Sequence, residues 1–191
     1  LISSLTNEQS SRPKLYPSRS DFDKIKVITK ATSYICIAPT SVWFTKQFPM
    51  EKWVELVNEQ DRSMEIFLLG APGDQSACES IKTNSSHPRV MNLAGQLSFL
   101  ESAALMKGAV MNFVNDSAPM HIASAVNAPV TAIYCSTVPA FGFGPLSDRK
   151  FVIETKEKLT CRPCGLHGFK SCPQGHFKCA TTIKISDLKK F

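Results

Sequence analysis

Residues 110–126 read Val-Met-Asn-Phe-Val-Asn-Asp-Ser-Ala-Pro-Met-His-Ile-Ala-Ser-Ala-Val. The apolar run 110–115 is typical of a buried strand, and the stretch 119–126 is typical of a helix. Between them, Ser117 is the expected helix N-cap, and Pro119 lies in the first turn, where its missing N–H is not needed. A strand that leads directly into a capped helix is the repeating unit of a parallel sheet covered by helices.

The same alternation continues on both sides of this stretch. The expected strands are 34–38, 65–69, 89–93, 110–115 and 130–135, with 150–154 as a sixth strand at an edge. The expected helices between them are 49–59, 75–83, 97–107 and 119–126. Strands that alternate with helices in this way predict an α/β fold with an open, doubly wound parallel sheet.

The chain of 191 residues has the length of one domain with a sizeable core. We expect that domain to span residues 34–182. Residues 1–33 have no sustained periodicity and are rich in Ser, Pro and Lys, so we expect a linker there. Residues 183–191 are expected to form a C-terminal tail, in which the helix candidate 186–190 is very short.

Composition excludes several classes of protein. With 43% apolar and 20% charged residues, the chain is neither disordered nor fibrous, and no apolar run is long enough to span a bilayer. The first residues lack the pattern of a signal peptide, which favours the cytoplasm. The net charge is +6, but acidic residues outnumber basic ones in 31–140. The positive charge therefore belongs to the two ends of the chain, and we expect no nucleic-acid partner.

The loops that follow the strands carry the candidate functional residues, because ligands of parallel sheets bind at the carboxyl ends of the strands. After strand 34–38, Thr40, Ser41 and Lys46 offer hydroxyls and an ammonium that suit phosphate oxygens. The alternative for them is a capped turn with a solvated lysine. After strand 65–69, Asp74 is either a helix N-cap or an acceptor for sugar hydroxyls.

The loop after strand 110–115 is the third candidate. The N-terminus of the helix that begins near Ser117 suits an anion such as a diphosphate, because its N–H groups and its dipole face the ligand. His121, one turn further on, has an imidazole that can donate to the same anion. An ordinary capped helix with a structural histidine explains these residues equally well.

The seven cysteines fall into two groups. Cys36, Cys78 and Cys135 lie in or beside apolar segments and are expected to be small core residues. The second group crowds into residues 161–179 and makes a candidate set of ligands for structural zinc: Cys161, Cys164, Cys172, His176 and Cys179. The spacing from Cys172 to Cys179 is not that of a common zinc knuckle, and free thiols are the alternative.

Five spaced motifs resemble, in the same order, the C-terminal domain of the lipopolysaccharide heptosyltransferases of glycosyltransferase family 9. The motifs are residues 38–49 followed by Trp53, residues 69–74, residues 92–95, residues 115–123 and residues 143–145. The segment 161–179 is similar to the cysteine-rich tail of the heptosyltransferase II branch. The resemblance covers about residues 34–182 and implies a Rossmann-like domain that forms one half of a GT-B glycosyltransferase.

The resemblance also implies roles for individual residues. Thr40, Ser41 and Lys46 would contact the diphosphate, and Leu97 would line the adenine pocket. Asp116, Ser117 and His121 would hold the sugar and phosphates, and Asp74 lies near a family acidic residue that binds ribose. The implied donor is ADP-heptose, the implied acceptor is the lipopolysaccharide inner core at the cytoplasmic face of the inner membrane, and no cofactor is implied for catalysis.

Two departures from the family pattern qualify these implications. Ala118 stands where the family usually has Gly, and its methyl group would hinder close approach of a sugar or phosphate to the backbone. The family's catalytic base belongs to an N-terminal domain that this sequence does not contain, so we expect no catalytic residue here and no activity from this chain alone. The first alternative is another GT-B sugar-nucleotide enzyme, with a different donor or an epimerase activity. A zinc-knuckle binding module ranks third.

Overall fold

The structure is a computed structural model that describes residues 12–30 and 32–188. Its strands are β1 (Tyr34–Ala38), β2 (Glu65–Leu68), β3 (Val90–Asn92), β4 (Met111–Asn115), β5 (Val130–Tyr134) and β6 (Lys150–Glu154). Its helices are α1 (Arg19–Thr29), α2 (Met50–Asn58), α3 (Gln75–Asn84), α4 (Phe99–Gly108), α5 (Ala118–Ala125), α6 (Lys178–Thr181) and α7 (Ile185–Leu188). Short 3-10 helices are η1 (Phe44–Lys46), η2 (Pro72–Asp74) and η3 (Pro139–Phe141).

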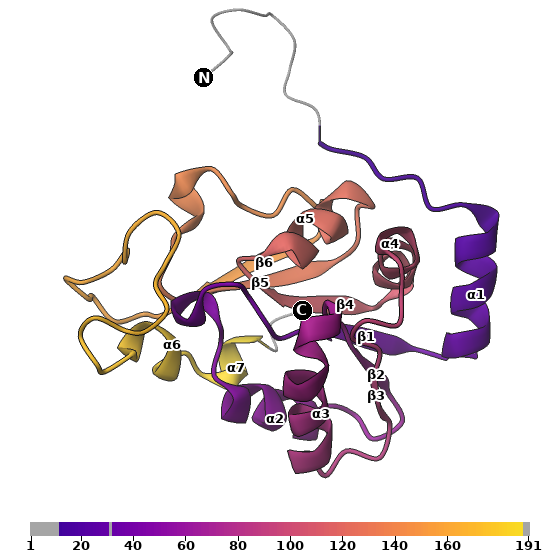
Figure 1. Cartoon of the computed structure of the whole chain (residues 1–191), viewed down its shortest axis with the longest axis horizontal. Helices are drawn as coiled ribbons and strands as arrows, with labels where there is room; N and C mark the ends of the chain where they lie inside the picture. The colour runs from indigo at the N-terminus through magenta and orange to yellow at the C-terminus, as the bar shows by residue number, and fades with distance from the viewer. Residues whose placement is uncertain (1–11, 31, 189–191) are drawn as a thin grey trace, which may run out of the picture.

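The six strands form one sheet in the order β3-β2-β1-β4-β5-β6 (Figure 1). Every neighbouring pair is parallel, which confirms the predicted open, doubly wound sheet. The chain builds outward from β1 to β3 and then continues from β4 on the other side of β1. The loops after β1 and β4 therefore lie side by side at the point where the strand order reverses, which is where such sheets bind ligands.

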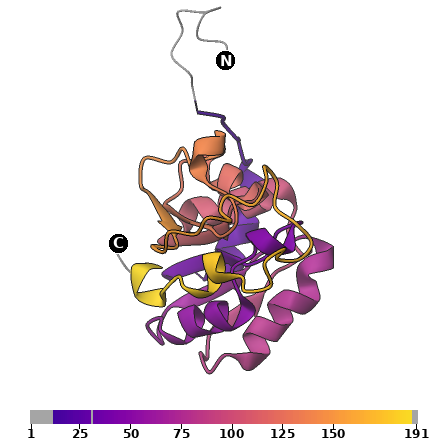
Figure 2. The same ribbon diagram turned by 90° about the vertical axis from the view of Figure 1, so that its left-hand side faces the viewer.

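Helices cover both faces of the sheet and bury two apolar layers (Figures 1 and 2). Strand β1 shows why, since all five of its residues are buried: Tyr34, Cys36 and Ala38 join one layer, whereas Ile35 and Ile37 join the other. The first layer packs against α1, α4 and α5, and the second against α2, α3, α6 and α7. Cys36, Cys78 and Cys135 are buried in these layers as expected.

The expected linker 1–33 is wrong for residues 19–29, which form α1. Ser18 caps this helix in a reciprocal capping box with Asp21, and Ile25 is only 5% exposed against α4. The helix escaped prediction because its apolar positions, Phe22, Ile25 and Ile28, cover barely two turns. Residues 1–11 and 31 of the expected linker lie outside the described residues.

The expected tail 183–191 is also wrong where the structure describes it. Ile183, Ile185 and Leu188 are buried in the second apolar layer, and α7 packs against α2. Burial of three apolar side chains within six residues makes the packed segment more stable than a solvated tail. Residues 189–191, which include the end of the expected helix 186–190, lie outside the described residues.

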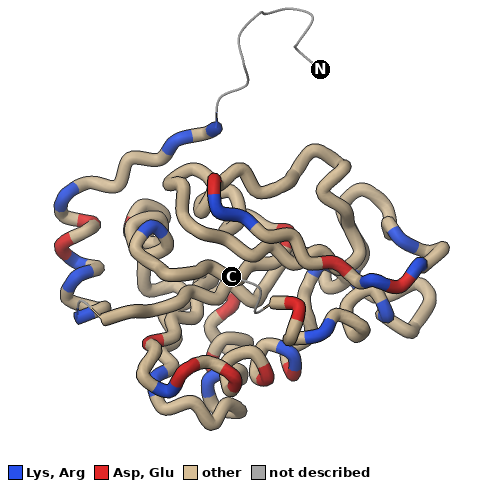
Figure 3. Tube along the Cα trace, turned by 180° about the vertical axis from the view of Figure 1, so that it is seen from behind, with Lys and Arg blue, Asp and Glu red and all other residues tan. Residues whose placement is uncertain are grey.

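The charge distribution follows the sequence analysis. Basic residues of α1 lie at one side of the molecule, and those of the segment 156–178 lie at the opposite side (Figure 3). Positive charge therefore does not form one continuous stripe across the sheet.

Candidate functional site

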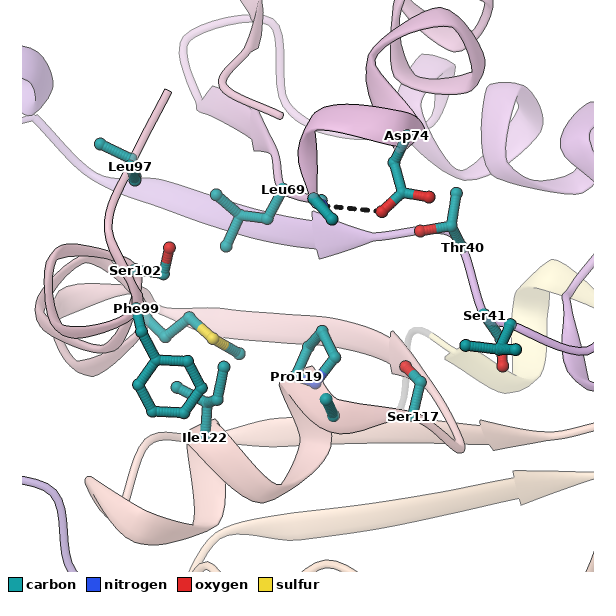
Figure 4. Close-up of a pocket in the computed structure, with 15 residues that line it drawn as sticks. Thr40, Ser41, Leu69, Asp74, Leu97, Phe99, Ser102, Ser117, Pro119 and Ile122 are labelled. Atoms are coloured by element: carbon teal, nitrogen blue, oxygen red, sulfur yellow. Dashed lines mark hydrogen bonds between the residues drawn. The ribbon is translucent and has the colours of Figure 1, made fainter. Parts of the chain in front are cut away.

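A cavity of about 500 Å³ opens at the carboxyl ends of β1, β2 and β4 (Figure 4). Six of the residues predicted from the sequence line it: Thr40, Ser41, Asp74, Leu97, Ser117 and Ala118. They come from the four segments that follow β1, β2, β3 and β4, so these segments converge on one cavity. The volume suits a nucleotide-sized ligand, since small-molecule sites measure about 300–1,000 Å³.

The cavity has two chemically different ends. Leu69, Leu97, Phe99 and Ile122 surround one end, whereas Asp74, Thr40, Ser41 and Ser117 gather at the other (Figure 4). Ser102 adds a hydroxyl at the apolar end (Figure 4). Such a cavity can bury a flat apolar ring at one end and bind oxygen-rich groups at the other.

The helix α4 supplies three residues to the apolar end, and the sequence analysis missed this contribution. Ser98 caps α4 through a capping box with Glu101, so the helix begins at Phe99 and not at Leu97. Phe99, Ser102 and Met106 then line the cavity from one face of the helix, because their spacing of three and four residues matches the helical period. The Ser-x-x-Glu pattern at 98–101 is the signal that identifies this start from the sequence.

Asp74 is the N-cap residue of α3, the position weighed as an alternative, but its side chain makes no capping hydrogen bond to that helix. Its Oδ2 accepts a hydrogen bond of 2.7 Å from the Ala71 N–H, which closes the η2 turn at the cavity wall (Figure 4). The carboxylate also borders the cavity. A contact with ribose therefore stays a prediction for this residue.

Ser117 is the N-cap of α5 as expected, but its side chain makes no capping hydrogen bond. Its hydroxyl donates instead to the Asn115 carbonyl oxygen at 3.4 Å. The helix start thus faces the cavity without a side-chain cap, and Ala118 is exposed beside it. An uncapped helix start next to a cavity is a favourable place for an anion.

Asn115, at the end of β4, fixes the first loop against the third. Its side chain is fully buried; Nδ2 donates to the Pro39 carbonyl oxygen at 2.7 Å, and Oδ1 accepts from the Phe48 N–H at 2.9 Å. These bonds hold Thr40 and Ser41 next to Ser117. The sequence analysis missed this role, and a polar residue at the end of a buried strand was the available signal.

Lys46 and Asp116 pair with each other behind the polar end. Lys46 Nζ lies 2.8 Å from Asp116 Oδ2, and their side chains are 16% and 9% exposed. The same carboxylate oxygen accepts a 2.6 Å hydrogen bond from Thr137 Oγ1, a residue the sequence analysis missed. Neither Lys46 nor Asp116 borders the cavity itself, so the structure pairs these two predicted residues just outside its lining.

His121 is not brought to the cavity. It lies exposed on α5, where its ring meets Phe143 edge-on with ring centroids 6.4 Å apart. A role for His121 in holding the donor therefore remains a prediction.

The cysteine-rich segment does not assemble a metal site. Cys161 Sγ lies 3.8 Å from His176 Nε2, and the Cys164 thiol donates to the Cys161 carbonyl oxygen at 3.0 Å. Across residues 12–30 and 32–188, however, no three His, Cys, Asp or Glu side chains are placed to hold one ion. Burial raises the pKa of Cys164, and burial also raises the pKa of Cys179 to about 11. The arrangement does not fit the expected zinc ligand set.

None of the helices in the described part of the chain is long and apolar enough to cross a bilayer.

Comparison with known proteins relates the chain to heptosyltransferases. It is 33% identical to lipopolysaccharide heptosyltransferase 3 of Escherichia coli over 108 residues, which cover 55% of this chain and 32% of that protein. It is 34% identical to lipooligosaccharide heptosyltransferase 2 of Haemophilus influenzae over 95 residues, which cover 48% of this chain and 27% of that protein. The aligned residues thus cover less than a third of the length of these curated relatives.

Solved structures show the same fold. The structure of E. coli ADP-heptose lps heptosyltransferase II matches with a TM-score of 0.76 at 21% identity, over 97% of this chain and 54% of that chain. A family 9 glycosyl transferase from Veillonella parvula matches with a TM-score of 0.71 at 20% identity, over 78% of this chain and 44% of that chain. These matches confirm the expected Rossmann-like half of a GT-B fold.

The family described as glycosyltransferase family 9 (heptosyltransferase) matches residues 6–166, which include every strand and every loop that forms the cavity. This match extends over most of the chain and agrees with the order of motifs quoted above. The chain belongs to glycosyltransferase family 9.

Proposed function

We propose that this chain binds the donor of a heptosyl transfer reaction, ADP-heptose, and that the acceptor is the inner core of lipopolysaccharide. The observation that carries the proposal is the two-ended cavity at the strand-order reversal, with the Lys46–Asp116 pair beside its polar end. E. coli heptosyltransferase WaaC, solved with ADP-2-deoxy-2-fluoro heptose, shares the fold with a TM-score of 0.62.

The two ends of the cavity bind different parts of the donor. The adenine ring packs between Leu97, Phe99 and Ile122, where apolar side chains bury its faces. The diphosphate lies over the start of α5 and within reach of the hydroxyls of Thr40 and Ser41. The positive end of the helix dipole and the hydroxyl donors favour its charge.

The Lys46 ammonium then turns from Asp116 toward the distal phosphate. Because Lys46 is paired with one carboxylate, a diphosphate offers it a more highly charged partner within reach of the same side chain. Asp116 keeps the hydrogen bond from Thr137 and is available to a sugar hydroxyl.

The chemistry that fits is displacement at the anomeric carbon. The acceptor hydroxyl oxygen forms a bond to that carbon, the bond from the carbon to the β-phosphate oxygen breaks, and ADP leaves with the electron pair. A base outside this chain takes the hydroxyl proton. Lys46 and the α5 N-terminus stabilise the charge that develops on the leaving group, so this scheme requires no cofactor. Transfer to a lipopolysaccharide core would take place at the cytoplasmic face of the inner membrane.

Ala118 favours a second candidate, a donor with a different sugar. Its exposed methyl group borders the polar end of the cavity, at the place where the sugar would approach the backbone. A sugar with less bulk on that side would fit more readily than heptose.

Calorimetry with the chain tests the proposal. ADP is expected to bind one to one, AMP more weakly and UDP not detectably, and a product assay with lipopolysaccharide core is expected to show no transfer. Comparison of ADP-heptose with ADP-glucose separates the two donors. Failure of ADP to bind would contradict the proposal, and turnover by this chain alone would contradict the external base.

A further inference from the structure

Thr45, directly before Lys46, is held by the cysteine-rich segment 161–179. Its side chain and backbone are almost fully buried, with 1% of the residue exposed. The Thr45 N–H donates to the Phe169 carbonyl oxygen at 3.1 Å, and Thr45 Oγ1 accepts from the Phe169 N–H at 2.7 Å. Two reciprocal bonds therefore join loops that are more than a hundred residues apart in the sequence.

Ser136, after β5, completes the contacts of Thr45. The Ser136 N–H donates to the Thr45 carbonyl oxygen at 3.2 Å, and Ser136 Oγ donates to Thr45 Oγ1 at 3.1 Å. The Cys164 N–H in turn donates to the Ser136 carbonyl oxygen at 2.8 Å. The N–H, the carbonyl and the hydroxyl of Thr45 are thus all bonded, and the segment 161–179 takes part directly and through Ser136.

Gly168 brings the same segment against the stem of Lys46. It is buried with φ +79°, and a Cβ built there would lie 2.8 Å from Thr45 Oγ1 and 3.1 Å from Lys46 Cγ. Only a residue without a Cβ allows the backbone this close and adopts this φ without strain. The lysine side chain therefore runs along the Gly168 backbone before it reaches Asp116.

Arg162, in the same segment, supports Asp116, the partner of Lys46 in the ion pair. Its guanidinium donates to the carbonyl oxygens of Cys135 at 2.6 Å and Thr137 at 2.7 Å, and it is paired with Glu154. Thr137 Oγ1 is the donor to Asp116. The segment 161–179 thus fixes the backbone that carries the partner of Asp116 as well as the turn that carries Lys46.

We propose that the segment 161–179 is a positioning element for the donor site: through Gly168 and Phe169 it fixes the turn and the side-chain stem from which the Lys46 ammonium reaches the donor's distal phosphate. This inference rests on the proposed function. No residue of the segment borders the cavity, so it acts on the donor only through Lys46 and Asp116. If the segment acts in this way, the affinity for a diphosphate depends on a turn that does not itself contact the donor.

The test compares two glycine substitutions in the same segment. Gly168→Ala places a methyl group against Thr45 and Lys46, whereas Gly175→Ala meets nothing within 4 Å although its φ is also positive, at +70°. Both carry the same kind of backbone strain. We expect Gly168→Ala to weaken ADP at least about tenfold with less than about twofold effect on AMP, which corresponds to about 1.4 kcal/mol for the tenfold part. Gly175→Ala is expected to leave both nucleotides unchanged.

A second pair of variants keeps the proposal testable if Gly168→Ala does not fold. Thr45→Val removes the oxygen that accepts from Phe169 and Ser136, and Thr45→Ser retains it. The valine variant is expected to lose the preference for ADP over AMP, and the serine variant to restore it. Addition of Gly168→Ala to Lys46→Ala is expected to cause no further change in the ADP-to-AMP ratio, because the lysine is already absent.

A measurement without nucleotide separates this inference from the proposed function. The rate at which acetic anhydride labels Lys46, read by mass spectrometry, reports how firmly the ammonium is held against Asp116. We expect faster labelling in Gly168→Ala than in the wild type or Gly175→Ala. Equal labelling in all three, or equal losses of ADP and AMP in Gly168→Ala, would overturn the positioning role. Absence of ADP binding by the wild type, with labelling still altered, would overturn the proposed function alone.

Discussion

At the scale of one residue, Lys46 is held by an ion pair beside the donor site. An ammonium and a carboxylate with little exposure neutralise each other, and Thr137 satisfies a further lone pair of Asp116. Such a pair is costly to break from one side, because the remaining charge stays buried without its partner. A diphosphate that takes over the ammonium must therefore compensate Asp116 as well, and a sugar hydroxyl is able to do so.

Lys46→Ala is expected to weaken ADP more than AMP, by about 1.5–3 kcal/mol, the value of a hydrogen bond to a charged group. The physical reason is that the ammonium meets the distal phosphate, which AMP lacks. Titration calorimetry with both nucleotides measures the difference. Lys52→Ala, which removes a lysine paired with Glu55 on α2, is the control and is expected to leave both affinities unchanged. Equal losses for ADP and AMP would place Lys46 away from the distal phosphate.

The buried thiol of Cys78 is expected to make the free energy of unfolding decrease at alkaline pH. Burial raises the pKa of its thiol to about 12, with Asp74 and Glu79 adding to the shift. In the unfolded chain the thiol ionises near its ordinary value, so from about pH 9 upward the unfolded state loses a proton that the folded state keeps. Stability from this group is therefore complete below about pH 9 and declines as the pH rises toward 12.

The expected slope of that decline is about 1.4 kcal/mol per pH unit for one thiol. Urea unfolding of the wild type and of Cys78→Ala at pH 8 and pH 10 measures it. The alanine variant starts less stable, because it leaves a small cavity, but loses less stability between the two pH values. The same pH dependence in both proteins would show that Cys78 ionises as readily in the fold as in the unfolded chain.

At the scale of elements, α1 is the piece that the sequence analysis left out. Its Ile25 packs among the residues of the first apolar layer, next to Tyr34 and the residues of α4. Lys24 also forms an ion pair of 2.8 Å with Glu101, the residue that completes the capping box of α4. The helix therefore covers an apolar face that would otherwise meet water.

Ile25→Ala is expected to lower the free energy of unfolding by about 2–4 kcal/mol, through lost burial and the cavity left behind. Val27→Ala on the same helix is the matched control, because Val27 is 77% exposed; its expected effect is within about 0.5 kcal/mol. Denaturant unfolding of both variants tests the pair. Similar small losses would mean that α1 contributes little to the stability of the domain.

At the scale of the whole molecule, the cysteine-rich segment raises the question of a metal. The described residues provide no set of three ligands for one ion, and the segment is held instead by Arg162 and by the bonds around Thr45. We expect protein purified without chelator to contain no stoichiometric zinc, and Cys161 and Cys172 to react with a thiol reagent, since both are partly exposed. Elemental analysis and thiol titration measure this. One zinc per chain, lost in Cys161→Ser, would show that the segment rearranges to bind it.

The sequence alone determined that the chain forms a parallel sheet, the succession of strands and helices along the chain, and the three candidate loops at the carboxyl edge of the sheet. These features follow from local patterns: apolar runs, turn residues and a proline in the first turn of a helix each act within a few neighbours. Thr40, Ser41, Asp74 and Ser117 were predicted from these patterns, Leu97 and Ala118 came from the family resemblance, and all six lie around one cavity. Their roles in binding the donor remain predictions.

Only the tertiary structure decided how that site is supported. The pairing of Lys46 with Asp116, the hydrogen bond from Thr137 and the bonds between Thr45 and Phe169 join residues that are far apart in the sequence. The apolar end of the cavity depends on how α4 and α5 pack on the sheet. The same packing places His121 against Phe143 and not at the cavity. The physical reason is that such contacts are selected by packing and by the need to satisfy buried polar groups, which act through space and leave no periodic signal along the chain.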